Sequence, residues 1–189
     1  MPKAALILTQ GFADWEYALI AGTGGPFYGI DVQFFTPQTG SLRSQGGLVT
    51  NVDQDLNQCR QWQPNSVVVV GGAIWADSQA PEIADFLNDC RTDGASIGGI
   101  CGGTLALARA GLLDTLPHTS NSRDFLIENA GNYAGASFYQ DRPSAVSADG
   151  IITAPGTAPV SFTAAIFESV GIAPELISQF TTMLAAEHH

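Results

Sequence analysis

Residues 95–111 read A-S-I-G-G-I-C-G-G-T-L-A-L-A-R-A-G, and this stretch does most to decide the fold class. Residues 95–100 form a short apolar run, which predicts a strand buried on both faces. Residues 103–110 predict a helix that ends at Gly111. Cys101 lies where the two elements meet, with glycines after it and before it. A sharp strand-to-helix turn built from small residues holds a nucleophilic side chain out above a sheet, as a nucleophile elbow.

Strands and helices alternate along most of the chain. The predicted strands span residues 4–9, 31–36, 66–70 and 95–100, with a short one at 46–50 and a hairpin of 144–147 and 151–153. The predicted helices span residues 14–27, 81–90, 103–110, 122–129, 159–170 and 174–186. Asp14 and Asn121 are interpreted as N-caps, and Pro81 as a first helical residue. Because the best strands are apolar on both faces, the pattern predicts an α/β fold with a mostly parallel sheet and helices on both faces.

Three distant pieces of sequence are expected to meet at one edge of this sheet. Glu16, Gly71-Gly72 and Cys101 each lie at or just after the end of a predicted strand. In open parallel sheets, ligands bind beyond the carboxyl ends of the strands. The sequence therefore predicts that a functional site is assembled there.

The composition is that of a single folded domain. Of the 189 residues, 45% are hydrophobic and 13% charged, so one large core is expected. We expect one domain over residues 1–187, with His188 and His189 as the remnant of an expression tag.

The net charge and the cysteine content limit the partners, cofactors and cellular location that we expect. A formal net charge of −11 repels phosphate backbones and anionic lipids, so neither nucleic acid nor a membrane is an expected partner. Cys59, Cys90 and Cys101 lack metal-ligand spacing, and an odd number argues against a disulfide framework, so no metal or other cofactor is expected. Free thiols favour a reducing compartment, and the expected location is cytoplasmic.

Cys101 is the predicted nucleophile of the site. The helix that follows points its N-terminus at the sulfur, which favours the thiolate over the thiol. The backbone amides of Gly102 and Gly72 are the predicted oxyanion donors. The alternatives are a structural cysteine in a tight turn and an ordinary turn at the end of a strand. Cys59 and Cys90 have no elbow around them and are interpreted as structural.

Two titratable residues are candidates to assist the thiol. A carboxylate beside a thiolate is repulsive, so Glu16 helps only if burial keeps it protonated and it donates a hydrogen bond to sulfur. The alternative is a solvated glutamate in a first helical turn. His118 could be the general base that takes the thiol proton, or a histidine in a surface loop.

Four segments carry a resemblance to a known family. They read A-L-I-L-T-Q-G-F-A-D-W-E (5–16), V-V-V-V-G-G (67–72), I-C-G-G-T-L-A-L-A-R-A-G-L-L-D (100–114) and I-T-A-P-G-T-A-P (152–159). In order and in strand context they resemble the ThiJ/PfpI superfamily of class I glutamine amidotransferase-like proteins, over nearly the whole chain. The resemblance implies a flavodoxin-like three-layer sandwich, frequently as a homodimer. It also implies that Cys101 is the reactive cysteine, Glu16 its protonated partner, and Gly72 and Gly102 the oxyanion amides.

The sequence departs from the family at a histidine. Many members carry a Thr-His pair after the elbow helix, and the register from Leu113-Asp114 places Ser120-Asn121 there. Asn121 then stands where the family histidine would be, and His118 falls three residues earlier. Either His118 substitutes through the loop, or the site has no Cys-His dyad.

Three functions are compatible with these residues. The first is covalent thiol catalysis on a small amide or carbonyl compound, as a hydrolase, amidase or glyoxalase-like lyase, with a small-molecule substrate. The second is a redox sensor or chaperone-like dimer in which Cys101 is oxidised. The third is a binding domain that has lost reactivity. Trp75 and Tyr139 are candidates to line the pocket, or to pack elsewhere.

Overall fold

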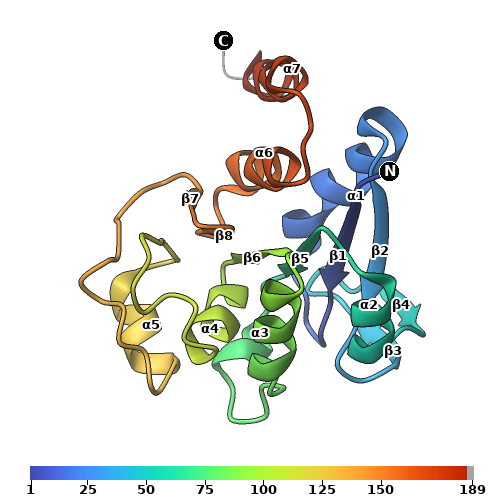
Figure 1. The fold of residues 1–189 in the computed structure, drawn as a ribbon. Helices are drawn as coiled ribbons and strands as arrows, with labels where there is room; N and C mark the ends of the chain where they lie inside the picture. The colour runs from blue at the N-terminus through green and yellow to red at the C-terminus, as the bar shows by residue number, and fades with distance from the viewer. Residues whose placement is uncertain (187–189) are drawn as a thin grey trace.

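Six strands form the central sheet of the computed structural model, which describes residues 1–186 (Figure 1). In spatial order they are β2 (Asp31–Phe35), β1 (Lys3–Ile7), β5 (Ser66–Val69), β6 (Ser96–Ile100), β8 (Ile151–Ala154) and β7 (Val146–Ala148). All neighbouring pairs are parallel except β7 with β8, which form the predicted antiparallel hairpin. The mostly parallel α/β sheet predicted from the sequence is confirmed.

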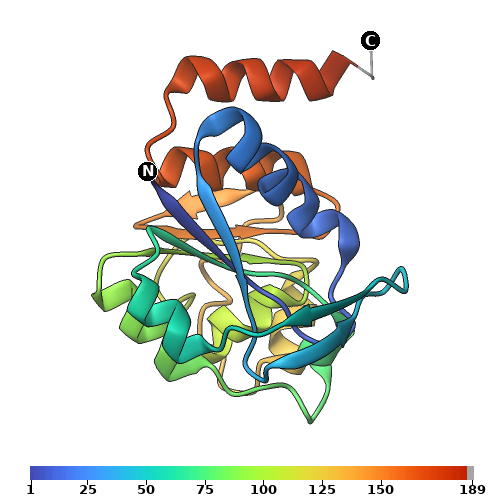
Figure 2. The same cartoon turned by 90° about the vertical axis from the view of Figure 1, so that its right-hand side faces the viewer.

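The described residues contain seven α-helices, which flank the sheet on both sides. They are α1 (Asp14–Tyr28), α2 (Leu56–Trp62), α3 (Ala84–Thr92), α4 (Gly103–Arg109), α5 (Arg123–Asn129), α6 (Pro159–Ser169) and α7 (Pro174–Ala185), and a short 3₁₀ helix, η1 (Ala73–Ala76), follows β5. Helix α7 packs on the outer side of α6. In Figure 1, α6 and α7 lie above the sheet and α2 to α5 below it, and Figure 2 shows the layers from the side. The three-layer sandwich implied by the family resemblance is therefore confirmed.

The alternating direction of side chains along each strand explains why the protein has two hydrophobic cores, one on each face of the sheet. Successive strand residues point to opposite faces of a sheet. Ala5 and Ile7 of β1 belong to the core beneath α2 to α5, whereas Ala4 and Leu6 belong to the core beneath α1, α6 and α7. Because all four are buried, the strand is apolar throughout, as a parallel strand covered on both faces must be.

Two glycines in β6 let helices approach the sheet from both sides. A Cβ on Gly98 would lie 2.8 Å from Cδ1 of Ile166 in α6, and a Cβ on Gly99 would lie 2.8 Å from Cδ1 of Leu107 in α4. A Cβ at either position would force the side chain of Ile166 or Leu107 to shift, so glycine permits the close packing seen here. Gly98 and Gly99 thus allow α6 and α4 to pack close to the sheet next to the elbow.

The segment between β2 and β5 differs from its prediction. The single strand predicted at 46–50 is wrong: β3 (Gly40–Arg43) and β4 (Val49–Val52) form a separate antiparallel pair, and Gly46-Gly47 lies in the turn between them. The sequence analysis also missed α2. Alternation in β3 and β4 is weak because few of their residues are buried, so periodicity did not reveal the hairpin.

Helix α1 begins at Asp14 as predicted, but three assignments at helix N-termini are wrong. Helix α3 begins at Ala84, so Pro81 precedes it rather than opening it. The N-cap of α1 is Ala13, and Asp14 instead accepts a hydrogen bond from the Gly46 amide at 2.7 Å, because the hairpin turn lies against this end of the helix. Ser122, whose hydroxyl accepts from the Phe125 amide, caps α5 in place of Asn121.

Candidate active site

Cys101 occupies a strained turn between β6 and α4. Its φ is 54°, in the left-handed region that non-glycine residues rarely adopt. The turn is held by its backbone: the Cys101 amide donates to the Ala154 carbonyl at 2.9 Å, and the Thr104 hydroxyl donates to the Cys101 carbonyl at 2.6 Å. This is the local geometry of a nucleophile elbow.

The glycines after Cys101 are required by neighbouring backbone. A Cβ on Gly102 would lie 2.6 Å from the carbonyl oxygen of Gly72, and a Cβ on Gly103 would collide with the carbonyl oxygen of Val69. The elbow is therefore pressed against the end of β5. This contact brings the Gly72 and Gly102 backbones together at the carboxyl edge of the sheet.

Glu16 is buried beside the elbow. Its side chain has no exposed area, and its Oε2 accepts a hydrogen bond from the Gly71 amide at 2.7 Å. The other oxygen, Oε1, has no hydrogen-bond partner among the described residues. Burial raises the pKa of this carboxyl from 4.5 to about 7, although the Gly71 amide opposes the shift.

The thiol of Cys101 and the carboxyl of Glu16 share one small space. A Cβ built on Gly156 would lie 3.0 Å from Sγ of Cys101 and 3.2 Å from Oε1 of Glu16, so both atoms face the same point. Burial raises the pKa of the Cys101 thiol, and the ionised form of Glu16 raises it further. Two groups placed like this cannot easily both be ionised, so the pair titrates as a unit.

Asn121 and the Gly102 amide counteract the rise in the pKa of the Cys101 thiol. Nδ2 of Asn121 donates a hydrogen bond to Sγ of Cys101 at 3.2 Å. Hydrogen bonds from Asn121 and from the Gly102 amide lower the pKa of the thiol because they stabilise the thiolate. An uncharged donor thus touches the sulfur in the segment after the elbow helix.

The loop after β8 closes over the pair. The Gly156 amide donates to Oδ1 of Asn121 at 3.0 Å, and the Trp15 indole donates to the Gly156 carbonyl at 2.9 Å. Gly156 is therefore held from both sides above Cys101 and Glu16. The sequence analysis gave Gly156 and Trp15 no role, although Gly156 follows a strand at the same sheet edge, which was a usable signal.

The two predicted oxyanion amides lie close together. A Cβ on Gly102 would lie 3.3 Å from the Gly72 nitrogen. Within residues 1–186, neither amide donates a hydrogen bond to another backbone group. Both can therefore donate to an oxygen atom that develops negative charge near Sγ.

His118 lies in a different environment from the thiol. It is fully buried, and Nδ1 pairs with the Leu116 carbonyl at 2.7 Å while Nε2 pairs with the Tyr133 hydroxyl at 2.6 Å. A carbonyl only accepts, so Nδ1 carries the proton and Nε2 accepts from Tyr133. Burial lowers the pKa of the imidazole, which keeps it neutral. No hydrogen bond joins it to Cys101 within residues 1–186, so its proton-transfer role stays a prediction.

Of the remaining candidates, Cys59, Cys90 and Trp75 are buried, and Tyr139 lines a pocket beside α5. Cys59 and Cys90 are buried, and burial raises the pKa of both thiols, that of Cys90 to about 11. Trp75 is fully buried, with its indole donating to the Val70 carbonyl, so it packs in the core rather than lining a pocket. Tyr139 contacts the His118 ring edge to face and donates to the Ser120 carbonyl.

Residues 1–186 contain no group of three or more His, Cys, Asp or Glu side chains arranged to hold a metal ion. Among the same residues, every helix is too short or too polar to cross a membrane.

The protein is an α/β sandwich with an elbow cysteine beside a buried carboxyl, on a mostly parallel sheet. The sequence model of the DJ-1/PfpI family matches residues 2–169. The chain belongs to this family.

Relatives of the chain are known from sequence and structure. It is 29% identical over 183 residues to "Uncharacterized protease YoaZ" of Bacillus subtilis, covering 93% of this chain and 87% of that protein. The crystal structure of the DJ-1 superfamily protein Atu0886 from Agrobacterium tumefaciens is 33% identical, covers both chains fully and superposes with a TM-score of 0.93. A thiJ/pfpI family protein from Bacillus anthracis is 26% identical, with a TM-score of 0.84 over 96% of this chain and 89% of the other.

Proposed function

We propose that this protein is a cysteine-dependent hydrolase that cleaves a small amide or activated carbonyl compound at Cys101. The observation that carries the proposal is the elbow thiol beside Glu16, a fully buried carboxyl whose second oxygen has no partner. An unpaired buried oxygen costs on the order of 1–3 kcal/mol. A proton on Oε1, donated to the thiolate, satisfies that oxygen and stabilises the nucleophile at once.

The proton balance follows from this pair. In the reactive form the one proton of the pair lies on Glu16, and the thiolate attacks the carbonyl carbon of the substrate. The Gly72 and Gly102 amides hold the resulting oxyanion. When the C–N bond breaks, the leaving amine takes the proton from Glu16. Water then cleaves the thioester, which releases the acid and restores the thiol. In this scheme Glu16, rather than His118, moves the proton.

Two findings support hydrolysis of an amide. Two relatives carry the name "Uncharacterized protease", and the Gly72 and Gly102 backbones lie together beside the elbow, which is consistent with an oxyanion site. The thiol is only partly exposed, under the Gly156 loop that Trp15 and Asn121 hold. We therefore propose a small substrate rather than a folded protein.

A second function is favoured by Asn121. An amide cannot take a proton as histidine does, but it can stabilise an oxidised sulfur by donating to it. The alternative proposal is a redox sensor in which peroxide converts the Cys101 thiolate to sulfenic and then sulfinic acid. Hydrogen peroxide is the oxidant, and it is reduced to water at each step.

The experiment that separates the two uses wild type, Cys101→Ser and Gly22→Ala. A Cβ on Gly22 meets no atom within 4 Å, so this variant is a matched control. Turnover of a panel of small amides, short peptides and 2-oxoaldehydes is measured, and the mass of the protein is followed under substoichiometric peroxide. Turnover that Cys101→Ser abolishes and Gly22→Ala retains supports the hydrolase. Absence of turnover across the panel, with rapid addition of two oxygen atoms at Cys101, supports the sensor instead.

The oligomeric state and the cellular location of the protein are also proposals. A homodimer is proposed because Trp15, Leu48 and Val49 are half-exposed apolar side chains, and the Gly46–Asp14 hydrogen bond brings the turn between β3 and β4 to the start of α1. Light scattering at several protein concentrations tests it, and a monomer at all of them would contradict it. A cytoplasmic location rests on the free thiols alone.

A further inference from the structure

A pair of buried hydroxyls lies next to the elbow. Thr104, in the first turn of α4, has no exposed area, and Ser120 is 2% exposed. Their hydroxyl oxygens are 2.7 Å apart, although 16 residues separate them in the chain. The Thr104 hydroxyl also lies 2.6 Å from the carbonyl oxygen of Cys101. The two hydroxyls therefore connect the backbone of the proposed nucleophile to the segment between α4 and α5.

The chemistry of the final acceptor fixes the direction of both hydrogen bonds. A carbonyl oxygen only accepts, so the single hydroxyl proton of Thr104 lies on the bond to Cys101. Thr104 has no second hydroxyl proton, so Ser120 must donate the bond between the two hydroxyls. The result is a directed chain from the Ser120 hydroxyl, through the Thr104 hydroxyl, to the Cys101 carbonyl. Hydrogen bonds in such a chain polarise and strengthen one another.

The Cys101 carbonyl belongs to the same peptide unit as the Gly102 amide. In a planar trans peptide the C=O and N–H bonds point in opposite directions, so holding the carbonyl also orients the amide. A hydrogen bond from the Gly102 amide lowers the pKa of the Cys101 thiol, so this amide faces the sulfur. It is also one of the two amides proposed to bind the oxyanion. The Thr104 hydroxyl therefore orients a donor of the active site.

Ser120 immediately precedes the other donor to the sulfur. Its carbonyl accepts from the Tyr139 hydroxyl at 3.3 Å, and its own hydroxyl donates to Thr104. Ser120 is thus held through both its backbone and its side chain. This anchor limits the position of Asn121, whose amide donates to Sγ of Cys101. Both neutral donors to the thiolate therefore depend on one chain of hydroxyls.

A helical serine or threonine that donates to a carbonyl one turn earlier is common. Ser161, Ser169 and Thr181 do so in α6 and α7, so this contact alone carries no functional meaning. Thr104 differs because its acceptor is the carbonyl of Cys101, whose φ of 54° is strained. A strained backbone persists only where its surroundings hold it. The hydroxyl chain supplies such a hold at the nucleophile itself.

We propose that Thr104 and Ser120 are positioning residues for the Cys101 centre. Their hydroxyl chain holds the peptide between Cys101 and Gly102, so that the Gly102 amide and Asn121 face the sulfur. The oxyanion part of this inference rests on the proposed hydrolase function. The thiolate part does not, because hydrolysis and redox sensing both need the thiolate. Alkylation of Cys101 requires no substrate, so it tests the inference even if the hydrolase proposal fails.

The readout is the pKa of the Cys101 thiol, from iodoacetamide rates across pH 4 to 10 on the full chain. A loss of stability alone would leave this pKa unchanged. Thr104→Val removes the hydroxyl but keeps the shape, so we expect the thiol pKa to rise and alkylation at pH 7 to slow about five- to tenfold. Thr104→Ser keeps the hydroxyl and should restore the wild-type profile. Ser120→Ala should slow alkylation about two- to fivefold, because Thr104 keeps its bond to the carbonyl.

The double variant tests whether the two hydroxyls act in series. Ser120 acts on the thiol through Thr104, so adding Ser120→Ala to Thr104→Val should change the alkylation rate little further. Fully additive effects would mean that the two hydroxyls act independently, which would overturn the chain. If Thr104→Val does not fold, Ser120→Ala and Thr104→Ser carry the same test.

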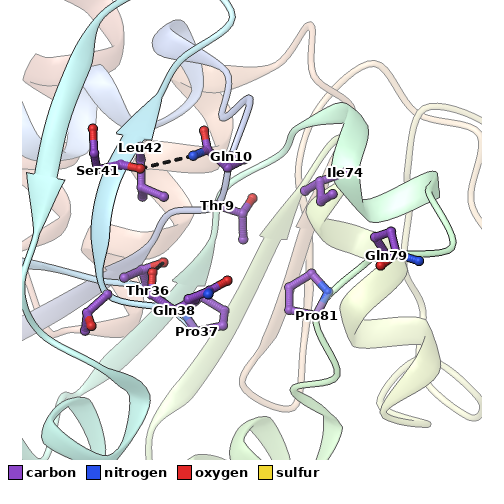
Figure 3. A pocket seen from close by; sticks show the side chains of 11 residues that line it. Thr9, Gln10, Thr36, Pro37, Gln38, Ser41, Leu42, Ile74, Gln79 and Pro81 are labelled. Carbon is purple, nitrogen blue, oxygen red and sulfur yellow. Dashed lines mark hydrogen bonds between the residues drawn. The ribbon is translucent and has the colours of Figure 1, made fainter.

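Two matched substitutions elsewhere serve as controls. Thr36 is 1% exposed, its hydroxyl donates to the Gln38 carbonyl at 3.2 Å, and it lines a cavity of about 340 Å³ beyond β2 (Figure 3). Two strands separate β2 from β6, which Cys101 follows. Ser96, at the start of β6, donates to the Ser169 hydroxyl at 2.9 Å. Thr36→Val and Ser96→Ala should leave the alkylation profile unchanged.

A raised thiol pKa in Thr104→Val, its reversal in Thr104→Ser and unchanged controls together support the inference. Wild-type profiles in both Thr104→Val and Ser120→Ala would overturn it. Equal slowing in Thr36→Val would also overturn it, because the loss of any buried hydroxyl would then suffice.

Discussion

The amide nitrogen of Asn121 donates to the sulfur of Cys101 at 3.2 Å, while the amide oxygen of the same residue accepts from the Gly156 backbone at 3.0 Å. One side chain thereby stabilises the thiolate and holds the loop above it. Loss of either the amide nitrogen or the amide oxygen of Asn121 should therefore change the environment of the thiol.

We predict that Asn121→Ala slows alkylation of Cys101 at pH 7 by about five- to tenfold, because one hydrogen bond to the thiolate is lost. Asn121→Asp should slow it more, since a second carboxylate raises the thiol pKa. Iodoacetamide rates with mass detection measure both variants. Faster alkylation in Asn121→Asp than in Asn121→Ala would refute the assigned role.

Gly156→Ala tests the space above the pair. Its Cβ would lie 3.0 Å from Sγ of Cys101 and 3.2 Å from Oε1 of Glu16. We expect alkylation of Cys101 to fall at least tenfold, while circular dichroism stays native. Gly22→Ala, which adds a methyl group in open space on α1, is the control and should be neutral or stabilising by up to about 1 kcal/mol. Equal alkylation rates in the two variants would show that the Gly156 loop does not cover the thiol.

Stability should depend on pH through Glu16. Burial raises the carboxyl pKa to about 7 in the folded protein, against 4.5 for the unfolded chain. The folded state therefore binds the proton more tightly, so stability falls as pH rises from about 4.5 to 7 and then levels off. Glu16→Gln carries no such charge, and its free energy of unfolding should exceed that of wild type at pH 8 by on the order of 3 kcal/mol.

Urea unfolding at pH 5 and pH 8 measures this difference. At pH 5 the difference should shrink to on the order of 1 kcal/mol, because the carboxyl of the folded wild type is protonated there while that of the unfolded chain is only partly so. A Glu16→Gln variant that is less stable at both pH values would instead show that the carboxylate gains more from the Gly71 amide than burial costs it.

His118→Phe should show whether His118 stabilises the fold or acts as a base for the Cys101 thiol. The change removes the hydrogen bonds to the Leu116 carbonyl and the Tyr133 hydroxyl, and we expect a loss of about 1–3 kcal/mol of stability. The pH profile of Cys101 alkylation should not move, since no hydrogen bond joins the two side chains. A shift of that profile would restore His118 as the base.

The sequence predicts the candidate site best at the carboxyl ends of the strands. Apolar runs before Gly71 and Cys101 predict buried parallel strands, and the rule that ligand sites lie at the carboxyl edge places Glu16, Gly72 and Cys101 together there. These inferences depend on local patterns and one topological rule. They therefore required no knowledge of how the loops fold.

The role of Asn121 could not be predicted in the same way. Asn121 precedes a helix, and asparagine is a common cap; only the three-dimensional path of the loop turns it to the sulfur, leaving Ser122 as the cap. The β3–β4 hairpin, with few buried residues, lacked a periodic signal.

The most direct test of the account is the pKa of Cys101 in wild type and Glu16→Gln, from alkylation rates across pH 4 to 10 with Cys101→Ser as the blank. If Glu16 holds the proton and donates it to the thiolate, Glu16→Gln substitutes a weaker donor, and the thiol pKa rises. If Glu16 is instead ionised beside a thiol, removing its charge lowers the thiol pKa. A rise supports the proposed pair; a fall, or no change, contradicts it.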